Sequence, residues 1–385
     1  MVATGTADSI GPVLERLRLD ANRDIWTERL HAVTSQDVEA ALASRPGSYD
    51  LGKLLALVSP AAEAYLEQMA QLSRQLTLQR FGRTVRLYAP LYLSSFCINR
   101  CQYCGFNRDN CFQRTRLNID EAMAEAEILA GEGFKDLLLV ASEDKQFVTT
   151  SYLTDLAEQL RRKFSFIGVE IYQMSAEEYR SLFEAGIEGV TLYQETYDRD
   201  AYTRYHLGGP KADFDVRLRG PDDFATAGMR EIGLGVLLGL ADWRIETLAL
   251  GEHAFRLFKR YWQSRISFSF PRLRPACGVP REAFPHLVTE KDLVQMMLAL
   301  RLCFADAGLV LSTREGARLR DRLVGLGITR MSAGSRTNPG GYSSQDSEKQ
   351  FEVDDQRSPS EIARMLADQG LEPVWKDWDR AFLAP

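Results

Sequence analysis

The sequence predicts an α/β protein built on a (β/α)8 TIM-type barrel, with an N-terminal helical extension and a C-terminal covering segment. From Arg86 onward, short apolar and β-branched runs alternate with longer amphipathic runs. This alternation is typical of parallel strands connected by helices. Eight strand-like runs occur up to Ser332, and eight is the number of strands that closes such a barrel.

The domain boundaries are placed where the composition changes. Residues 1–85 are interpreted as the helical extension, residues 86–332 as the barrel, and residues 333–385 as the covering loop and helix. Within the extension, Ser59 and Pro60 are typical of a helix start, and apolar residues follow at helical spacing. We identify no chemistry there and expect a layer of helices packed on the barrel.

The expected strands of the barrel are residues 87–94, 136–141, 166–172, 189–194, 231–238, 266–270, 309–312 and 328–332. The clearest helices between them are residues 119–130, 151–164, 176–184, 243–262 and 290–307. In this architecture the active site is built at the carboxyl ends of the strands. Residues that directly follow a strand are therefore the first candidates for chemistry.

The covering segment begins with an irregular stretch. Residues 333–356 are rich in Gly, Ser, Asn and Asp, so they form either a disordered segment or a functional covering loop. Ser358, Pro359 and Glu361 then predict an N-cap, a first-turn proline and a capping box. A short helix over residues 360–369 should follow.

Composition excludes several classes of protein. The 385-residue chain has a net charge of −6, which gives no bias toward nucleic acid and no polybasic membrane anchor. No apolar run approaches the roughly 18 residues that a membrane span needs, and residues 1–12 do not resemble a secretory signal. We expect a cytoplasmic protein whose six cysteines stay reduced and serve metal binding or catalysis.

Three of these cysteines form the strongest motif in the chain. Cys97, Cys101 and Cys104 stand four and three residues apart, directly after the first expected strand. A loop at a strand end can direct three thiolates to one point, and soft thiolates select iron–sulfur clusters, zinc or copper(I). Three ligands on a four-iron cubane would leave one iron open to a small molecule.

The main alternative to a cluster is a structural zinc site. Structural zinc normally takes four ligands, and the sequence has no second cysteine pair. Cys111 is a weaker candidate for a fourth ligand, and Cys277 and Cys303 are weaker still. The four histidines do not stand at metal-ligand spacing from one another, so we interpret them as structural.

With Tyr103 before the third cysteine, the motif resembles that of the radical S-adenosylmethionine (SAM) superfamily. Five segments resemble the aromatic amino acid lyases of that superfamily: residues 90–97, 103–106, 193–197, 269–275 and 311–315. Two more, residues 339–342 and 374–379, resemble the 2-iminoacetate synthases, the tyrosine lyases of thiazole biosynthesis. The resemblance covers most of the chain, from about Ser59 to Asp379.

The resemblance implies a [4Fe-4S] cluster on the three cysteines, with SAM bound at the open iron. In the family, an electron from a flavodoxin-type donor cleaves SAM to methionine and a 5′-deoxyadenosyl radical, which takes a hydrogen from the amino group of L-tyrosine. The Cα–Cβ bond then breaks to give p-cresol and 2-iminoacetate, which thiazole synthase consumes. The cofactors supply this chemistry, and the protein supplies ligation, orientation and exclusion of water.

The resemblance also assigns residues to the cofactor. These are Tyr103, Phe106, Glu143, Glu195, Tyr197 and Arg217. Glu143 would contact the amino group of SAM, although Ser142 stands where the superfamily usually has glycine. The alternatives from the residues alone are a solvated strand-end acid for Glu143, packing or helix capping for Glu195 and Tyr197, and a surface ion pair for Arg217.

A second set of residues is assigned to the substrate. Arg314 follows the seventh strand, where its guanidinium fork suits an amino-acid carboxylate, and Ser332 would be a second donor to that carboxylate. Tyr92 matches a family residue near the substrate amino group. The alternatives are a structural salt bridge for Arg314 and packing inside the barrel for Tyr92. Either Arg272 or Arg274 is expected to face the site, and the other a surface acid.

Three rival functions remain open to test. The tyrosine lyase that matures hydrogenase carries a second cluster on a cysteine-bearing C-terminal extension, and here no cysteine follows Cys303. A tryptophan lyase is disfavoured by the segments at residues 339–342 and 374–379. From another class, the chain could be a metal-binding scaffold without turnover, which product analysis would distinguish from the lyases.

Overall fold

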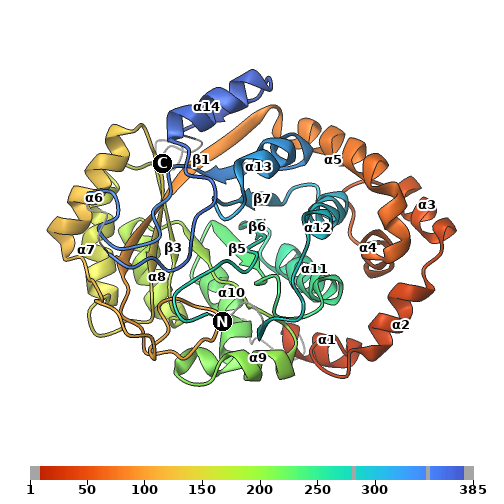
Figure 1. Ribbon diagram of the computed structural model, residues 1–385, viewed down its shortest axis with the longest axis horizontal. Coiled ribbons are helices and arrows are strands. Elements are labelled where there is room, and N and C mark those ends of the chain that lie inside the picture. The colour runs from red at the N-terminus through yellow and green to blue at the C-terminus, as the bar shows by residue number, and fades with distance from the viewer. Residues whose placement is uncertain (1–8, 280–282, 344–346, 377–385) are drawn as a thin grey trace.

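The expected barrel is present in the computed structural model, which describes residues 9–279, 283–343 and 347–376. The parallel strands follow the order β2-β3-β4-β5-β6-β7-β8-β1, and β1 also pairs with β2 to close the ring. Helices surround the strands on all sides (Figure 1). The strands of the barrel are β1 (Thr84–Ser94), β2 (Asp136–Ala141), β3 (Phe166–Glu170), β4 (Gly189–Thr191), β5 (Glu231–Gly235), β6 (Arg265–Ser269), β7 (Gly308–Leu311) and β8 (Arg330–Ser332).

The five helices that were expected by residue range are present, and three of them end earlier than expected. The barrel helices of the described residues are α6 (Ile119–Gly131), α7 (Thr150–Leu160), α8 (Ala176–Ala185), α9 (Arg199–Tyr205), α10 (Phe214–Thr226), α11 (Trp243–Arg260), α12 (Glu290–Cys303) and α13 (Ala317–Leu323). Of these, α9, α10 and α13 had not been predicted by range. Among the described residues, the 3-10 turns η3 (Pro210–Ala212) and η5 (Val324–Leu326) accompany them. Several predicted strands extended too far, since the apolar residues after β3, β4 and β5 belong to loops at the carboxyl ends of the strands rather than to the sheet.

The N-terminal extension is helical, as expected. It contains α1 (Ile10–Leu17), α2 (Asp24–Ala32), α3 (Ser35–Ala43), α4 (Leu51–Val58), η2 (Pro60–Tyr65) and α5 (Leu66–Phe81). Ser59 does cap the turn that begins at Pro60, but that turn is a 3-10 helix, and α5 begins only at Leu66. Helices α4 and α5 pack on α11 and α12, so the extension lies outside one side of the barrel (Figure 1).

A ninth strand was not expected. β9 (Glu372–Val374) pairs in parallel with residues 84–86 at the start of β1. The sequence gives little warning, because a three-residue strand that contains Pro373 and is at most half-buried has no alternating pattern. The last part of the motif at residues 374–379, Asp377 to Asp379, lies outside the described residues.

A ring of four ionised side chains fills the amino-terminal end of the barrel. Arg86 lies 2.7 Å from both Asp136 and Glu231, and Arg330 lies 2.6 Å from Asp136 and 2.8 Å from Glu231. All four are buried, and they come from β1, β2, β5 and β8. Because each charge has two opposite partners, the ring places four charges at this end of the barrel without leaving any of the four unpaired.

The covering segment runs over the opposite, carboxyl-terminal end. Its described parts, residues 333–343 and 347–358, are irregular but are fixed to the barrel through backbone hydrogen bonds such as Asp354 N to Thr313 O at 3.1 Å. Helix α14 (Pro359–Asp368) follows, with the predicted capping box between Ser358 and Glu361. None of the helices in the described ranges has the length and apolarity needed to cross a membrane.

Candidate active site

A cavity with about 980 Å³ of unfilled space, part of it open to solvent, lies at the carboxyl ends of the strands. Its wall includes all three motif cysteines. A second cavity, with about 580 Å³ of unfilled space that also includes some open solvent, lies beneath the covering segment. The two cavities share wall residues, namely Val140, Glu170, Tyr193, Pro271, Arg314 and Phe351. The outer and inner cavities therefore form one site with two compartments.

The cysteine loop is held in shape by an arginine. The guanidinium of Arg114 donates to backbone carbonyls at Ser95 and Phe106 on one nitrogen, and at Asn107 on the other. Such a fork fixes the loop without using the thiols. Cys101 is buried and Cys97 and Cys104 are half-buried, so the thiols line the cavity rather than the surface.

Asn99, which sequence reasoning missed, joins the cysteine loop to its neighbours. Its Nδ2 donates to Oε2 of Glu143 at 2.6 Å, and its Oδ1 accepts from the backbone N of Lys211 at 3.0 Å. Glu143 is buried and lines the outer cavity at the end of β2. The structure thus places Glu143 in the wall of the outer cavity, and not on the surface.

Glu195 lies on the same wall with two cations. Its Oε1 is 2.6 Å from Nζ of Lys211 and 3.5 Å from Arg217. Burial alone would raise the pKa of Glu195, but Lys211 and Arg217 outweigh it and hold the pKa below its usual value. The backbone of Glu195 has a φ of 70°, a left-handed conformation that costs a non-glycine residue about 1–2 kcal/mol. Such strain is common at functional sites.

The remaining residues assigned to the cofactor divide into two groups. Tyr103 lines the outer cavity, and its hydroxyl lies 2.7 Å from Nε2 of His206, whose ring is neutral because burial lowers its pKa to about 3. Phe106 and Tyr197 line neither cavity. The ring of Phe106 is buried against Tyr92, and the hydroxyl of Tyr197 lies 2.8 Å from Nδ1 of His253 in the core. The structure therefore does not bring their side chains to the site.

The residues assigned to the substrate surround the inner cavity. Tyr92, Arg314 and Ser332 all line it. The Oγ of Ser332 accepts from the backbone N of Thr313 at 3.0 Å, which ties the ends of β7 and β8 together. The guanidinium carbon of Arg314 lies 3.5 Å from the centre of the Phe351 ring. The ring therefore covers one face of the guanidinium and leaves the N–H groups at its edge able to donate hydrogen bonds.

Glu170 and Tyr193 sit where the two compartments meet, and neither was expected. Burial raises the pKa of Glu170 to about 7, against an opposing effect of Arg314. Burial likewise raises the pKa of Tyr193 well above its ordinary value, so its hydroxyl stays protonated. Glu170 ends β3, so the rule that strand ends carry the chemistry would have found it.

The two arginines after β6 have separate partners. Arg272 donates from Nε to Glu315 at 2.9 Å and does not line the site, whereas Arg274 lines the outer cavity and pairs with Asp354 of the covering segment. Arg274 is therefore the one that faces the site. Glu315 is buried rather than a surface acid. Cys111 and Cys277 are exposed, and Cys303 is buried in the core, away from the cavity.

The chain is similar to known proteins over most of its length. The chain matches the Radical SAM superfamily over residues 91–250 and the Biotin and Thiamin Synthesis associated domain over residues 269–372. It is 44% identical to the 2-iminoacetate synthase of Escherichia coli (strain K12) over 91% of this chain and 93% of that protein. The Salmonella typhimurium 2-iminoacetate synthase is 45% identical over the same shares of the two chains.

The chain belongs to the 2-iminoacetate synthase family. A solved structure supports the fold independently: the FeFe-hydrogenase maturase HydG from Carboxydothermus hydrogenoformans superimposes with a TM-score of 0.81 at 31% identity, covering 95% of this chain and 82% of that one. Radical SAM enzymes use a [4Fe-4S] cluster and SAM, and these are the cofactors of this family member.

The residues of the site fit those cofactors. Burial raises the pKa of the Cys101 thiol to about 12, so this sulfur keeps its proton until a metal displaces it. Across the described ranges, no three His, Cys, Asp or Glu side chains are grouped so as to hold a metal ion. The ligands of a four-iron cubane need not lie as close together as those of a single metal ion, because each cysteine binds a different iron. The adjoining acids Glu143 and Glu195, and the cations Lys211 and Arg217, offer partners for the amino, hydroxyl and carboxylate groups of SAM.

Sequence reasoning missed several wall residues, among them Asn99, Lys211, Gln350 and Phe351. Asn99 stands between Cys97 and Cys101, and nothing in the local sequence distinguishes it from an ordinary loop residue. Lys211 follows a Gly-Gly-Pro turn 16 residues after Glu195, and no local pattern relates the two. Gln350 and Phe351 reach the site only because the covering segment folds back over the barrel.

Proposed function

We propose that this protein cleaves the Cα–Cβ bond of L-tyrosine to give p-cresol and 2-iminoacetate. The single observation that supports this most is its membership of the 2-iminoacetate synthase family across 91% of the chain. The continuity of the outer and inner cavities adds to it, since an amino acid in the inner one would lie beside a cofactor in the outer one. When bound, the cluster and SAM supply the one-electron chemistry that starts the reaction.

In this proposal the chain's own side chains divide the work of binding. Arg314 binds the tyrosine carboxylate through its guanidinium edge, with Ser332 as a second donor to the same group. Tyr92 lies near the substrate amino group. Cys97, Cys101 and Cys104 hold the cluster, which leaves one iron without a protein ligand.

The cofactor side is assigned to the acids and cations of the outer wall. Glu143 accepts from the amino group of SAM, and Glu195 accepts from its ribose hydroxyls, as a carboxylate at the catalytic face can. Arg217 is assigned to the methionyl carboxylate, with Tyr103 forming part of the same wall. Phe106 and Tyr197 do not contact the cofactor in this proposal. They support the wall of the site by packing, Phe106 against Tyr92 and Tyr197 against His253.

The role of Glu170 follows from its protonation state. Because burial raises its pKa to about 7, Glu170 can be neutral while a substrate carboxylate is bound to the neighbouring Arg314. A neutral acid neither repels the substrate anion nor neutralises the arginine. The covering segment lies over this compartment and would limit the access of water to it, which would strengthen each of these contacts.

Three further parts of the proposal concern the surroundings of the enzyme. 2-Iminoacetate hydrolyses readily as an imine, so we propose that it passes directly to a thiazole synthase. A flavodoxin-type protein is proposed as the one-electron donor. A cytoplasmic location is proposed because a reducing compartment keeps the three thiols available for the cluster.

The deciding experiment is anaerobic turnover. The reconstituted protein is incubated with L-tyrosine, SAM and a one-electron reductant, and the products are separated by chromatography. The expected products are p-cresol, 2-iminoacetate (or glyoxylate formed from it by hydrolysis) and 5′-deoxyadenosine. Carbon monoxide and cyanide would indicate the hydrogenase-maturase reaction instead, an indolic acid from tryptophan would indicate a tryptophan lyase, and no product would favour a binding scaffold.

A further inference from the structure

The covering segment does more than lie over the barrel, because two consecutive side chains enter the site. Gln350 and Phe351 both line the outer cavity, and Phe351 also lines the inner one. The backbone of Gln350 is fixed on both sides: its N donates to Thr337 O at 2.9 Å, and its O accepts from Gly105 N at 3.2 Å. The segment is thus held directly against the cysteine loop.

Gly105 permits this close approach. A Cβ at position 105 would lie 2.5 Å from the carbonyl oxygen of Gln350, a distance that real Cβ atoms essentially never show. Any side chain there would push the two segments apart. The sequence of the cysteine loop is therefore matched to the covering segment.

The two side chains contact residues of both compartments. The hydroxyl of Tyr92 donates to Oε1 of Gln350 at 2.8 Å, and Nε2 of Gln350 lies 3.7 Å from the sulfur of Cys104. Phe351 covers one face of the Arg314 guanidinium at 3.5 Å. Two of the substrate-binding groups named above, Tyr92 and Arg314, are therefore each oriented by one residue of the covering segment.

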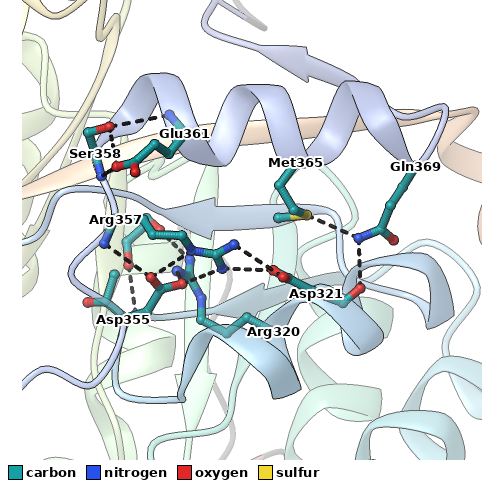
Figure 2. A network of polar contacts seen from close by, with 10 residues as sticks. Arg320, Asp321, Asp355, Arg357, Ser358, Glu361, Met365 and Gln369 are labelled. Atoms are coloured by element: carbon teal, nitrogen blue, oxygen red, sulfur yellow. Dashed lines mark hydrogen bonds and ion pairs between the residues drawn. The ribbon is translucent and has the colours of Figure 1, made fainter.

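A buried ionic anchor fixes this segment a few residues further on (Figure 2). Asp355 is 1% exposed and pairs with Arg320, whose side chain is fully buried. Asp355 also accepts from Arg357 at 2.7 Å, and Arg357 reaches on to Asp321 at 2.7 Å.

The anchor is linked to both substrate-side strand ends. Arg320 donates to the backbone oxygen of Ser332, at the end of β8. The backbone nitrogens of Asp354 and Asp355 both donate to the oxygen of Thr313, the residue before Arg314. Moving Asp355 would therefore move Phe351 relative to Arg314.

We propose that Gln350 and Phe351 are positioning residues for the amino-acid substrate and that the Arg320–Asp355 pair sets their place. Phe351 covers one face of the Arg314 guanidinium and leaves its edge for the inner cavity, and Gln350 fixes the orientation of the Tyr92 ring by accepting from its hydroxyl. This inference rests on the proposed function, because that function assigns Arg314 and Tyr92 to tyrosine. It adds the element that makes those two side chains rigid before the substrate arrives, so less ordering is needed on binding.

The test measures binding of L-tyrosine to the reconstituted protein in the presence of SAM, by anaerobic calorimetry, beside the KM and kcat of turnover. Phe351→Leu removes the aromatic face and keeps an apolar side chain. We expect about tenfold weaker tyrosine binding, with KM rising by the same factor and kcat changing less than threefold. Phe351→Tyr restores the aromatic face and is expected to bind within about threefold of the wild type. Iron content and SAM affinity should stay unchanged in both.

The anchor is tested with a matched pair of variants. Asp355→Asn removes the charge that faces Arg320, whereas Asp321→Asn removes the half-exposed partner of Arg357 and leaves Asp355 intact. Asp355→Asn should weaken tyrosine binding about tenfold and speed hydrogen exchange at the amides of Gln350, Asp354 and Asp355. Asp321→Asn should do neither. For the Phe351→Leu variant, the matched control is Phe255→Leu. Phe255 is a half-buried phenylalanine of α11 that contacts Lys259, so this variant makes the same replacement outside the site.

The outcomes separate this inference from the proposed function. If Arg314→Ala loses tyrosine binding while Phe351→Leu keeps it, the positioning role is overturned and the substrate assignment stands. If neither variant changes tyrosine binding, both are overturned. If Asp355→Asn does not fold, the Phe351 series still decides, because that residue lies outside the anchor.

Discussion

Asn99 and Glu143 come from loops after different strands, and the amide Nδ2 of Asn99 lies 2.6 Å from the carboxylate of Glu143. The other end of the same amide accepts from the backbone of Lys211 at 3.0 Å. The short side chain of Asn99 thus fixes the position of the Glu143 carboxylate and of the backbone at Lys211. A Cβ at Gly209 would lie 2.3 Å from this amide oxygen, which shows how tightly the three segments meet.

Replacing Asn99 should impair the cofactor side and spare the cluster. In Asn99→Ala the buried carboxylate of Glu143 loses a charge-assisted hydrogen bond, worth about 1.5–3 kcal/mol. We expect SAM affinity to fall roughly tenfold or more, with iron content and the visible absorbance unchanged. Asn107→Ala, in the same loop but bonded only to Asp109 N among the hydrogen bonds of its side chain in the described structure, is the control. Equal SAM affinity in both variants would contradict the role given to Asn99.

Removing Arg314 should affect the substrate alone. Arg314→Ala removes the guanidinium edge from the inner cavity, so we expect the KM for tyrosine to rise at least about tenfold, because two charge-assisted bonds are lost. Arg314→Lys keeps the charge without the planar fork and should recover only part of the loss. The absorbance of the cluster is the control. Unchanged tyrosine affinity in Arg314→Ala would show that the carboxylate binds elsewhere.

Tyrosine binding should weaken as pH rises through about 7. Burial raises the pKa of Glu170 to about 7, so this acid is neutral below that pH and becomes an anion above it. The anion would neutralise Arg314 and repel the substrate carboxylate. Titration calorimetry between pH 6 and 8.5 should show a several-fold loss of affinity that Glu170→Gln abolishes. The same pH profile in wild type and variant would exclude Glu170 as its source.

The ionic ring at the other end of the barrel should matter for stability and not for binding. Glu231→Gln leaves Arg86 and Arg330 with a single buried acid, and breaking such a pair costs about 3–5 kcal/mol. We expect a clearly lower melting temperature, with tyrosine and SAM affinities unchanged in the folded protein. Asp306→Asn, in an exposed ion pair with Arg80, should melt like the wild type. Equal melting temperatures for the two variants would count against the ring as a stabilising element.

The barrel and the cluster loop could be predicted from sequence because both depend on local patterns. β2 was predicted to the residue, since Asp136–Ala141 is one apolar run with a charged start. Cys97, Cys101 and Cys104 stand within one loop, so their spacing alone brings them together. Arg314 follows β7 and Ser332 ends β8, so the barrel pattern already predicted that both lie at the carboxyl ends of the strands.

The residues that were missed depend on the path of the chain in space. Gln350 meets Tyr92 across 258 positions of sequence, and no periodicity connects them. β9 forms because the chain returns to the start of β1. A three-residue strand is too short to have a sequence pattern that would predict this pairing. Tyr197 was assigned to the site by resemblance, but its hydroxyl turns inward to His253; the strand end fixes where a residue sits and not where its side chain points.

The arrangement of β1 has a consequence for how the protein is made. This strand pairs with β2 along residues 89–94, with β8 along residues 86–88 and with β9 along residues 84–86. On the ribosome, β1 emerges among the first of the strands, while β8 and β9 emerge last. The seam of the barrel therefore joins early and late segments, a long-range pairing of the kind that forms slowly. We therefore expect closure of this seam to be a late step in folding.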